Sequence, residues 1–275
     1  MKIARSVAEV RASGSTSCGF VPTMGAFHEG HLSLMRAAKA DCGFCAVSLF
    51  VNPTQFGPHE DYTKYPRDEA NDIALAEAAG CDLLFIPAAE EIYAGDQISV
   101  SVGSLADVYE GYVRPGHFNG VATVVSKLIH IFEPKVAYFG QKDLQQCAVI
   151  RALFKEQFFN STLRILPTMR EPNGLALSSR NRYLTPEQIQ NAGLLNRVLR
   201  RIAGSDDAVE TAIKSGIQAL QSTGWQVDYL DLVDFDTFEP LIHRTERGAA
   251  IGAARLGNTR LIDNVLICDD FFFAK

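Results

Sequence analysis

The sequence predicts an α/β protein in which a doubly wound parallel sheet is followed by a smaller α+β domain. Short apolar runs alternate with longer amphipathic stretches from residue 18 to about residue 168, as in parallel strands joined by helices. Beyond residue 170, helical patterns precede three strand patterns. A chain of 275 residues is long enough for two domains. We expect them over residues 1–169 and 170–275.

The first strand and helix frame a short polar turn. Residues 18–21 are apolar and read as a buried strand, which Pro22 and Gly25 interrupt before a helical pattern begins at Gly30. Amides at such a helix N-terminus are expected to be unpaired and to favour phosphate. His28 and His31 lie at this point and could donate hydrogen bonds to phosphoryl oxygens as charge builds. The alternatives are a surface pair or half of a zinc site.

The remaining elements of the first domain follow in order. Residues 1–17 read as a short leader with a helical start. A buried strand at 46–51 ends in a polar loop at 52–58, where open α/β sheets place ligands. The later predictions are a helix to about residue 79, strands at 82–87 and 98–102, a turn at 114–120, a helix at 121–132 and a strand at 135–139.

A second strand–glycine–helix connection follows, at Gly140-Gln141-Lys142-Asp143. Here a lysine could supply charge to a phosphate. Its helix is expected to run to about residue 158, before a last strand at 163–168. Strands alternating with helices in this way predict right-handed crossovers and a Rossmann-like sheet.

The second domain begins with a loop at 170–181 that carries hydroxyl groups between two arginines. Thr185 then has the features of a helix N-cap, with Pro186 at the first helical position. A further helix is expected over 207–223, and strands over 227–233, 248–256 and 260–267.

Composition excludes several classes of protein. The chain is 47% hydrophobic and 21% charged, which is ordinary for a globular protein, and its net charge of −6 argues against a general nucleic-acid binder. It shows neither the pattern of a signal peptide nor an apolar run that could span a membrane. The six scattered cysteines are expected to be reduced. We therefore expect a cytoplasmic protein with no membrane partner.

Four loops are expected to meet at one edge of the sheet, because each follows a strand at its carboxyl end. They carry cations, imidazoles and hydroxyls suited to a polyphosphate leaving group, namely His28, His31, Lys142, Ser178, Ser179 and Arg180. The sequence contains neither a Walker motif nor Gly-x-Gly-x-x-Gly, which argues against a P-loop enzyme and a standard dinucleotide binder.

A carboxylate nucleophile would explain why no general base stands out, because a carboxylate is already ionised at neutral pH. Gln55 and Gln146 could hold a small polar acid, with Met24, Phe56 and Phe139 as walls. Each polar residue also has an ordinary alternative. Either glutamine could satisfy a loop or lie on a helix surface, Lys142 could be solvated, and Arg180 could form a surface pair. His59, His117, His130 and His243 are expected to be structural or surface residues.

The chain resembles the pantoate–β-alanine ligase family. The matching segments are Pro-Thr-Met-Gly-x-x-His-x-Gly-His at 22–31, Phe-Val-Asn-Pro-x-Gln-Phe at 50–56, Tyr-Pro-Arg at 65–67, Arg-Pro-Gly-His-Phe-x-Gly-Val at 114–121, Phe-Gly-Gln-Lys-Asp-x-Gln-Gln at 139–146, Gly-Leu-Ala-Leu-Ser-Ser-Arg-Asn at 174–181, Ala-Arg-Leu-Gly at 254–257 and Arg-Leu-Ile-Asp-Asn at 260–264. They cover nearly the whole chain in order. The wider superfamily of His-x-Gly-His nucleotidyltransferases shares only the first motif and a mobile phosphate loop.

The resemblance implies condensation of (R)-pantoate with β-alanine through a pantoyl adenylate, with release of AMP and pyrophosphate. It implies ATP as substrate, Mg²⁺ on the phosphates, a homodimer and a C-terminal lid domain. Gln55, Gln146 and Asn52 would bind pantoate or β-alanine. The metal ligands are left open, with Asp72 and Asp143 as candidate outer-shell partners. The residues implied to bind ATP are Met24, Gly25, Ala26, Phe27, His28, Glu29, Gly30, His31, Gly140, Gln141, Lys142, Asp143, Met169 (by its backbone), Leu177, Ser178, Ser179 and Arg180.

In the resemblance, His28 and His31 stabilise the pentavalent phosphorus, with Lys142, Ser178, Ser179 and Arg180 as the other catalytic groups. Family descriptions call His31 a proton donor. Three features depart from the family pattern or have no assigned role: Thr54 in place of a common Met, His59, and the tail at 268–275.

Two other readings stay open at this stage. One is a nucleotidyltransferase that adenylylates a phosphate ester, such as a nicotinamide-mononucleotide or pantetheine-phosphate adenylyltransferase. That enzyme would need extra cations for its acceptor and would release a dinucleotide. The other is a nucleotide-sensing module, which would have no need of both histidines.

Overall fold

The computed structural model describes residues 1–14, 17–57 and 62–268. Its contacts divide the chain into two compact units. Unit 1 comprises Met1–Gly140 with Val149–Leu166, and unit 2 comprises Gln141–Ala148 with Pro167–Lys275. Residues 141–148 thus pack with the second unit, although they precede the expected domain boundary at 169. The expected domains of 1–169 and 170–275 stay a prediction, and each unit is described by itself below.

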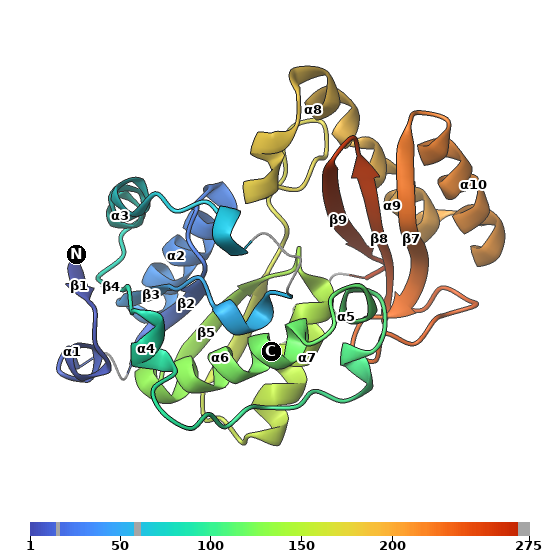
Figure 1. Cartoon of the computed structure of the whole chain (residues 1–275). Coiled ribbons are helices and arrows are strands. Elements are labelled where there is room, and N and C mark those ends of the chain that lie inside the picture. The colour runs from blue at the N-terminus through green and yellow to red at the C-terminus, as the bar shows by residue number, and fades with distance from the viewer. Residues whose placement is uncertain (15–16, 58–61, 269–275) are drawn as a thin grey trace. The chain divides into compact units, whose positions relative to one another are not determined.

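Unit 1 contains a six-stranded sheet in the order β1-β4-β3-β2-β5-β6, in which every paired strand is parallel (Figure 1). The predicted doubly wound sheet is confirmed. Its strands are β1 Lys2–Ala4, β2 Gly19–Thr23, β3 Cys45–Leu49, β4 Leu83–Phe85, β5 Val136–Gly140 and β6 Thr162–Leu166.

Helices cover both faces of this sheet. Val21 of β2 packs with Met35 and Ala38 of one helix, whereas its neighbour Phe20 stacks on Phe132 of another, with ring centroids 4.2 Å apart. Successive residues of a strand point to opposite faces, so the two helices lie on opposite sides. The helical segments are α1 Val7–Arg11, α2 Glu29–Cys42, η1 Pro53–Gln55, η2 Tyr62–Lys64, α3 Glu69–Ala78, α4 Ala89–Ile92, η3 Ser104–Ala106, α5 Glu110–Val113, α6 His117–Phe132 and α7 Leu144–Glu156, of which residues 144–148 belong to unit 2.

Three predictions for unit 1 are wrong. The expected turn at 114–120 is shorter, because α6 already begins at His117. Residues 2–4 form the edge strand β1. A strand of three residues is too short to be recognised from its sequence. Residues 98–102 are not a strand. The amides of Val100 and Val102 instead donate to Thr123 Oγ1 (2.9 Å) and Asn119 Oδ1 (2.8 Å) of α6. Side chains of α6 therefore satisfy the backbone amides of this segment. Its alternating pattern does not reflect pairing in a sheet.

Unit 2 combines a three-stranded antiparallel sheet, in the order β7-β8-β9, with helices packed against it. The predicted small α+β fold is confirmed. Thr185 caps α8 as expected, and its hydroxyl accepts a hydrogen bond from the Gln188 amide. The elements are η4 Ser179–Tyr183, α8 Pro186–Ala192, α9 Leu194–Gly204, α10 Val209–Gln221, β7 Trp225–Asp234, β8 Gly248–Leu256 and β9 Thr259–Leu266.

No helix among the described residues combines the length and apolar character needed to cross a bilayer. All six cysteines are free thiols, and Cys18, Cys45, Cys81 and Cys147 are buried. Burial raises the pKa of Cys18 to about 12, which keeps this thiol protonated and unreactive. His59 and residues 269–275 of the tail lie outside the described residues.

Candidate active site

The turn between β2 and α2 has an unusual backbone. Gly25 and the alanine after it both have positive φ angles, of +83° and +52°. Ala26 is a non-glycine residue in the left-handed region, which L-residues seldom adopt. A Cβ on Gly25 would lie 2.8 Å from Oδ2 of Asp72, so this position also has no room for a side chain.

Asp72 of α3 holds this turn from the side. Its Oδ2 accepts a hydrogen bond from the Ala26 amide and its Oδ1 accepts one from the Phe27 amide, each at 2.8 Å. The carboxylate is only 1% exposed. The sequence suggests Asp72 only as a candidate outer-shell partner of a metal ion, because nothing in the order of residues connects it to amides more than forty positions earlier.

His28 and His31 form a reciprocal cap at the start of α2. The Gly30 amide donates to His28 Nδ1 (3.2 Å), and the His28 amide donates to His31 Nδ1 (3.4 Å). The two rings lie 4.2 Å apart between centroids. A neutral imidazole that accepts at Nδ1 carries its proton on Nε2. Both histidines are thus fixed as Nε2–H donors.

The same contacts contradict the prediction of unpaired amides at this helix start. The Ala26 and Phe27 amides bond to Asp72, and those of His28, Gly30 and His31 bond within the histidine cap. These five N–H groups are engaged by the protein. The imidazoles and the remaining amides of the turn are then the donors that it could offer to a phosphate.

The loop after β3 is organised by a buried asparagine. Asn52 is 1% exposed, and its Nδ2 donates to Gln55 Oε1 (3.1 Å) and to the Gly120 carbonyl (3.2 Å). Its Oδ1 accepts from the Thr54 hydroxyl (3.0 Å) and from the Tyr93 hydroxyl (2.7 Å). Thr54, the departure from the family pattern, is thus part of this network. As a ligand, Asn52 would have to give up one of these bonds.

Gln55 lies next to Met24, as the expected acid pocket requires. Its Nε2 lies 3.0 Å from the Met24 sulfur, and its side chain is buried. The backbone carbonyl of Gln55 accepts a hydrogen bond from Nδ1 of His117 at 2.9 Å, while Arg114 donates to Nε2 of the same ring at 3.0 Å. A carbonyl only accepts and a guanidinium only donates, so His117 is neutral here.

Two residues of this network were missed or undervalued from the sequence. No sequence pattern points to Tyr93, and the sequence predicts only an ordinary structural role for His117. Burial raises the pKa of Tyr93, so its hydroxyl stays protonated and donates to Asn52. The motif at 114–121 contained a usable signal, because a histidine after a Pro-Gly turn at a helix start is well placed to bond to a neighbouring loop.

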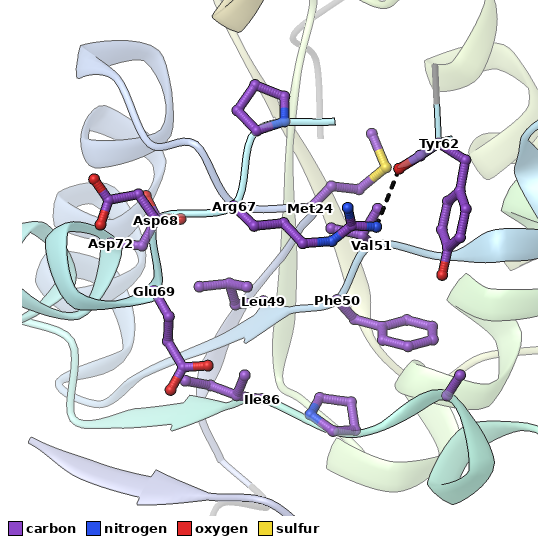
Figure 2. A pocket seen from close by; sticks show the side chains of 13 residues that line it. Met24, Leu49, Phe50, Val51, Tyr62, Arg67, Asp68, Glu69, Asp72 and Ile86 are labelled. Carbon is purple, nitrogen blue, oxygen red and sulfur yellow. Dashed lines mark hydrogen bonds between the residues drawn. The ribbon is translucent and has the colours of Figure 1, made fainter. Parts of the chain in front are cut away.

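A cavity of about 230 Å³ lies beside the β2–α2 turn in unit 1 (Figure 2). Arg67 lies across it, with Nη2 donating to the Tyr62 carbonyl (3.1 Å) and its guanidinium 5.1 Å from the centre of the Tyr62 ring. Of the residues predicted to bind ligands, Met24 alone lines it. The lining is Met24, Leu49, Phe50, Val51, Tyr62, Pro66, Arg67, Asp68, Glu69, Asp72, Ile86, Pro87 and Ala89.

In unit 2, the segment that carries Lys142 is tied to β9. Asn264 donates from Nδ2 to the Gln141 carbonyl (3.1 Å) and to the Lys142 carbonyl (3.0 Å), and its Oδ1 accepts from Gln141 Nε2 (3.0 Å). Lys142 Nζ lies 3.5 Å from the carboxylate of Asp143, which is exposed. Gln146 follows on α7 and is half-buried.

The loop that carries Ser178 and Ser179 is anchored by Asp263, which precedes Asn264 in the Arg-Leu-Ile-Asp-Asn motif at 260–264. Asp263 forms a two-pronged ion pair with Arg170, at 2.7 and 2.9 Å, and both side chains are largely buried. The Met169 carbonyl accepts from the Leu177 amide (2.9 Å), which closes the loop. The Arg-Leu-Ile-Asp-Asn motif at 260–264 therefore supports two predicted ligand segments, a role the sequence did not indicate.

Ser179 and Arg180 begin the short helix η4, Ser178 directly precedes it, and all three are half-buried. Ser178 caps it, accepting a hydrogen bond from the Arg180 amide (3.2 Å). Met169 is 39% exposed. His130 lies on the exposed face of α6 against Phe159, and His243 is exposed, as expected for surface residues.

Within each unit, the structure gathers part of the predicted site. Unit 1 brings together His28 with His31 and Gln55 with Met24. Unit 2 brings Gln141 and Lys142 together on Asn264. Across the described residues, no group of three His, Cys, Asp or Glu side chains could hold a metal ion.

Known proteins resemble this chain over nearly its whole length. A family model described as pantoate–β-alanine ligase matches residues 1–266. The pantothenate synthetase of Acidiphilium cryptum is 48% identical over 97% of this chain and 100% of its own. That of Chloroflexus aggregans is 47% identical, with the same two coverages.

Solved structures show the same likeness. Pantothenate synthetase from Thermus thermophilus matches with a TM-score of 0.93 and 45% identity, over 98% of this chain and 100% of its own. A pantoate–β-alanine ligase from Francisella tularensis, complexed with β-γ ATP and β-alanine, matches with a TM-score of 0.81 and 36% identity, over 97% and 98%. This chain therefore belongs to the pantoate–β-alanine ligase family and is a ligase of pantothenate biosynthesis.

Proposed function

We propose that this ligase joins (R)-pantoate to β-alanine through a pantoyl adenylate. The observation that carries the proposal is the pair of imidazoles fixed as Nε2–H donors at the start of α2. Such donors suit a step in which negative charge grows on phosphoryl oxygens. The Francisella tularensis relative, complexed with β-γ ATP and β-alanine, supports the choice of substrates.

In the first proposed step, a pantoate carboxylate oxygen attacks the α-phosphorus of ATP and pyrophosphate leaves. The product is a mixed anhydride of pantoate and AMP. In the second step the neutral β-alanine amine attacks the acyl carbon, an amide bond forms, AMP leaves, and the amine loses one proton to solvent. The first nucleophile is already ionised at neutral pH. The protein therefore has mainly to position the reactants and neutralise charge.

His28 and His31 are proposed to donate hydrogen bonds to the α-phosphoryl oxygens in the first step. Each keeps Nδ1 as an acceptor within the cap, so its donor remains directed by the protein during the reaction. This role needs no transfer of a proton to pyrophosphate. We therefore propose His31 as a hydrogen-bond donor, and not as a general acid.

Pantoate is assigned to Gln55 and Gln146, with Met24 as an apolar wall. Gln55 is held through its side chain, which accepts from Asn52, and through its backbone carbonyl, which accepts from His117. A neutral amide can accept from hydroxyls and donate to a carboxylate. Asn52 is proposed to act chiefly by holding Gln55.

ATP is assigned to groups of each unit. Unit 1 would contribute the turn from Met24 to His31 and Gly140. Lys142 would supply a point charge to the phosphates, and Arg180 with Ser178 and Ser179 would supply directional donors. The other proposed contacts of unit 2 are Gln141, Asp143, Leu177 and the Met169 backbone.

Mg²⁺ is proposed to bind chiefly through the ATP phosphates. Mg²⁺ keeps several waters and is usually bound through one or two protein carboxylates together with substrate phosphates. Asp143, an exposed carboxylate beside Lys142, is the candidate protein ligand. When bound, the ion would neutralise phosphate charge.

We further propose a cytoplasmic homodimer that binds no nucleic acid. Ile98 and Tyr112, in the segment between β4 and α6, are 87% and 77% exposed. A contiguous patch of exposed apolar side chains marks an interface, whereas single ones do not, so the contribution of this segment is tested by substitution. Analytical ultracentrifugation should show a dimer that Tyr112→Asp shifts toward monomer.

The function is tested by following nucleotide products. The protein is incubated with ATP, Mg²⁺ and pantoate, with and without β-alanine. We expect AMP and pyrophosphate to form in repeated turnovers only when both pantoate and β-alanine are present. A dinucleotide formed when a phosphate ester is offered, with no AMP, would instead indicate an adenylyltransferase.

A further inference from the structure

Asp72 is a buried carboxylate that the proposed reaction does not use. It lies on the first turn of α3, where the helix dipole favours negative charge. Both of its oxygens accept amide hydrogen bonds from the β2–α2 turn. A fully buried charge needs such partners, and here the partners belong to the segment that leads directly into the histidine cap.

The two amides that Asp72 holds are those that set the path of the turn. Ala26 is kept at a positive φ, and Phe27 places its ring 5.6 Å from the ring of His31. The next residue, His28, is the N-cap of α2. If the carboxylate were lost, Ala26 could relax to an ordinary conformation, and this shift would pass through Phe27 to both imidazoles.

We infer that Asp72 is a positioning residue for the catalytic histidines, acting through the Ala26 and Phe27 amides. The inference rests on the proposed function, because its readout is formation of pantoyl adenylate. It differs from a role of Asp72 beside the metal ion, in which substitution would change the dependence on Mg²⁺.

Asp72→Asn is the informative substitution. The amide keeps the shape of the side chain but replaces one acceptor by an NH₂ group that would face a backbone N–H. A misplacement of catalytic groups by about 1 Å can cost about a hundredfold in rate. We expect the rate constant for pantoyl adenylate formation to fall tenfold or more, with the KM for ATP within about threefold of the original value.

Asp68→Asn is the matched control. Asp68 immediately precedes the same helix and lines the same cavity (Figure 2), but it caps α3 by accepting from the Asn71 amide. Asparagine is as good an N-cap as aspartate. We expect this variant to keep its turnover within about twofold.

Turnover is measured per active site, from the burst of AMP-containing intermediate in rapid-quench experiments. A merely structural role would lower the melting temperature and the active fraction, but not the rate constant of the sites that remain. Gly25→Ala disturbs the same turn. The fold loss in rate of the double variant should therefore be smaller than the product of the fold losses of Gly25→Ala and Asp72→Asn.

Two results would overturn the inference. One is an Asp72→Asn enzyme with an unchanged rate constant per site. The other is a loss of rate that excess Mg²⁺ restores, which would assign Asp72 to the metal. Failure of the proposed function itself would look different, because the unsubstituted protein would then form no AMP.

Discussion

The connections β2–α2 and β5–α7 look alike in sequence, since each is a strand, a glycine and a helix with a polar start. Their glycines are there for different reasons. Gly25 has a φ of +83°, and a Cβ on it would lie 2.8 Å from Asp72. A Cβ on Gly140 would meet nothing within 4 Å. The pattern is thus shared, but the strain is confined to the first connection.

The anchors of the two connections also have opposite chemistry. Asp72 accepts two amide N–H groups, whereas Asn264 donates to two carbonyls and accepts from a side chain. The first connection depends on one buried charge and a strained residue. The second relies on several neutral bonds. We therefore expect the first to be more sensitive to substitution than the second.

The largest effect is expected at the histidine cap. His31→Ala should lower kcat by about 10²–10³, because removal of one preorganised donor to a developing charge costs about this much. ATP binding, measured by calorimetry, should stay nearly unchanged. His130→Ala, on the exposed face of α6, is the control. Equal turnover of the two variants would remove His31 from the mechanism.

Gly25→Ala and Gly140→Ala compare the two connections directly. The first substitution adds a methyl group at a positive φ and against a buried carboxylate, and it should lower kcat/KM by about tenfold or more. The second has open space around its Cβ, so its loss should be about threefold at most. Equal losses in steady-state kinetics would contradict the difference in strain.

Asn264→Ala tests the anchor of the second connection. It leaves the carbonyls of Gln141 and Lys142 without this donor, so the lysine should be less well placed for phosphate. An unsatisfied buried group costs about 1–3 kcal/mol, and we expect the KM for ATP to rise by about tenfold at most. Asn258→Ala, on the exposed turn of the same hairpin, should leave that KM unchanged.

Gln146→Ala should have the most selective effect. A lost hydrogen bond to substrate is worth about 0.5–1.5 kcal/mol, so the KM for pantoate should rise by about two- to tenfold with the KM for ATP constant. Gln157→Ala, exposed just beyond α7, is the control. If the KM for ATP moved instead, Gln146 would not belong to the acid pocket.

Much of the fold could be predicted because its signals are local. Apolar runs, helix caps such as Thr185 and the glycine-containing turns each depend on a few adjacent residues. The short strand β1 was missed because its three residues gain their meaning only by pairing with β4. Residues 98–102 were misread because their amides bond to side chains of α6.

The residues proposed to carry the chemistry could be predicted from motifs. The residues that hold them in place could not. Asp72 and Asn264 act on backbone groups that are distant in sequence, and such contacts leave no pattern of spacing. The state of the imidazoles depends in the same way on which amides they accept from. The prediction of free amides failed because His28 and Asp72 satisfy those amides first.

The central claim is that the pantoate carboxylate attacks the α-phosphorus of ATP. It is tested most directly with pantoate labelled with ¹⁸O in its carboxylate, by mass spectrometry of the products after one turnover with β-alanine. Our account predicts one labelled oxygen in AMP, because the bridging oxygen of the anhydride leaves with the phosphoryl group. Label in inorganic phosphate, with ADP as the nucleotide, would show attack at the γ-phosphorus and contradict the account.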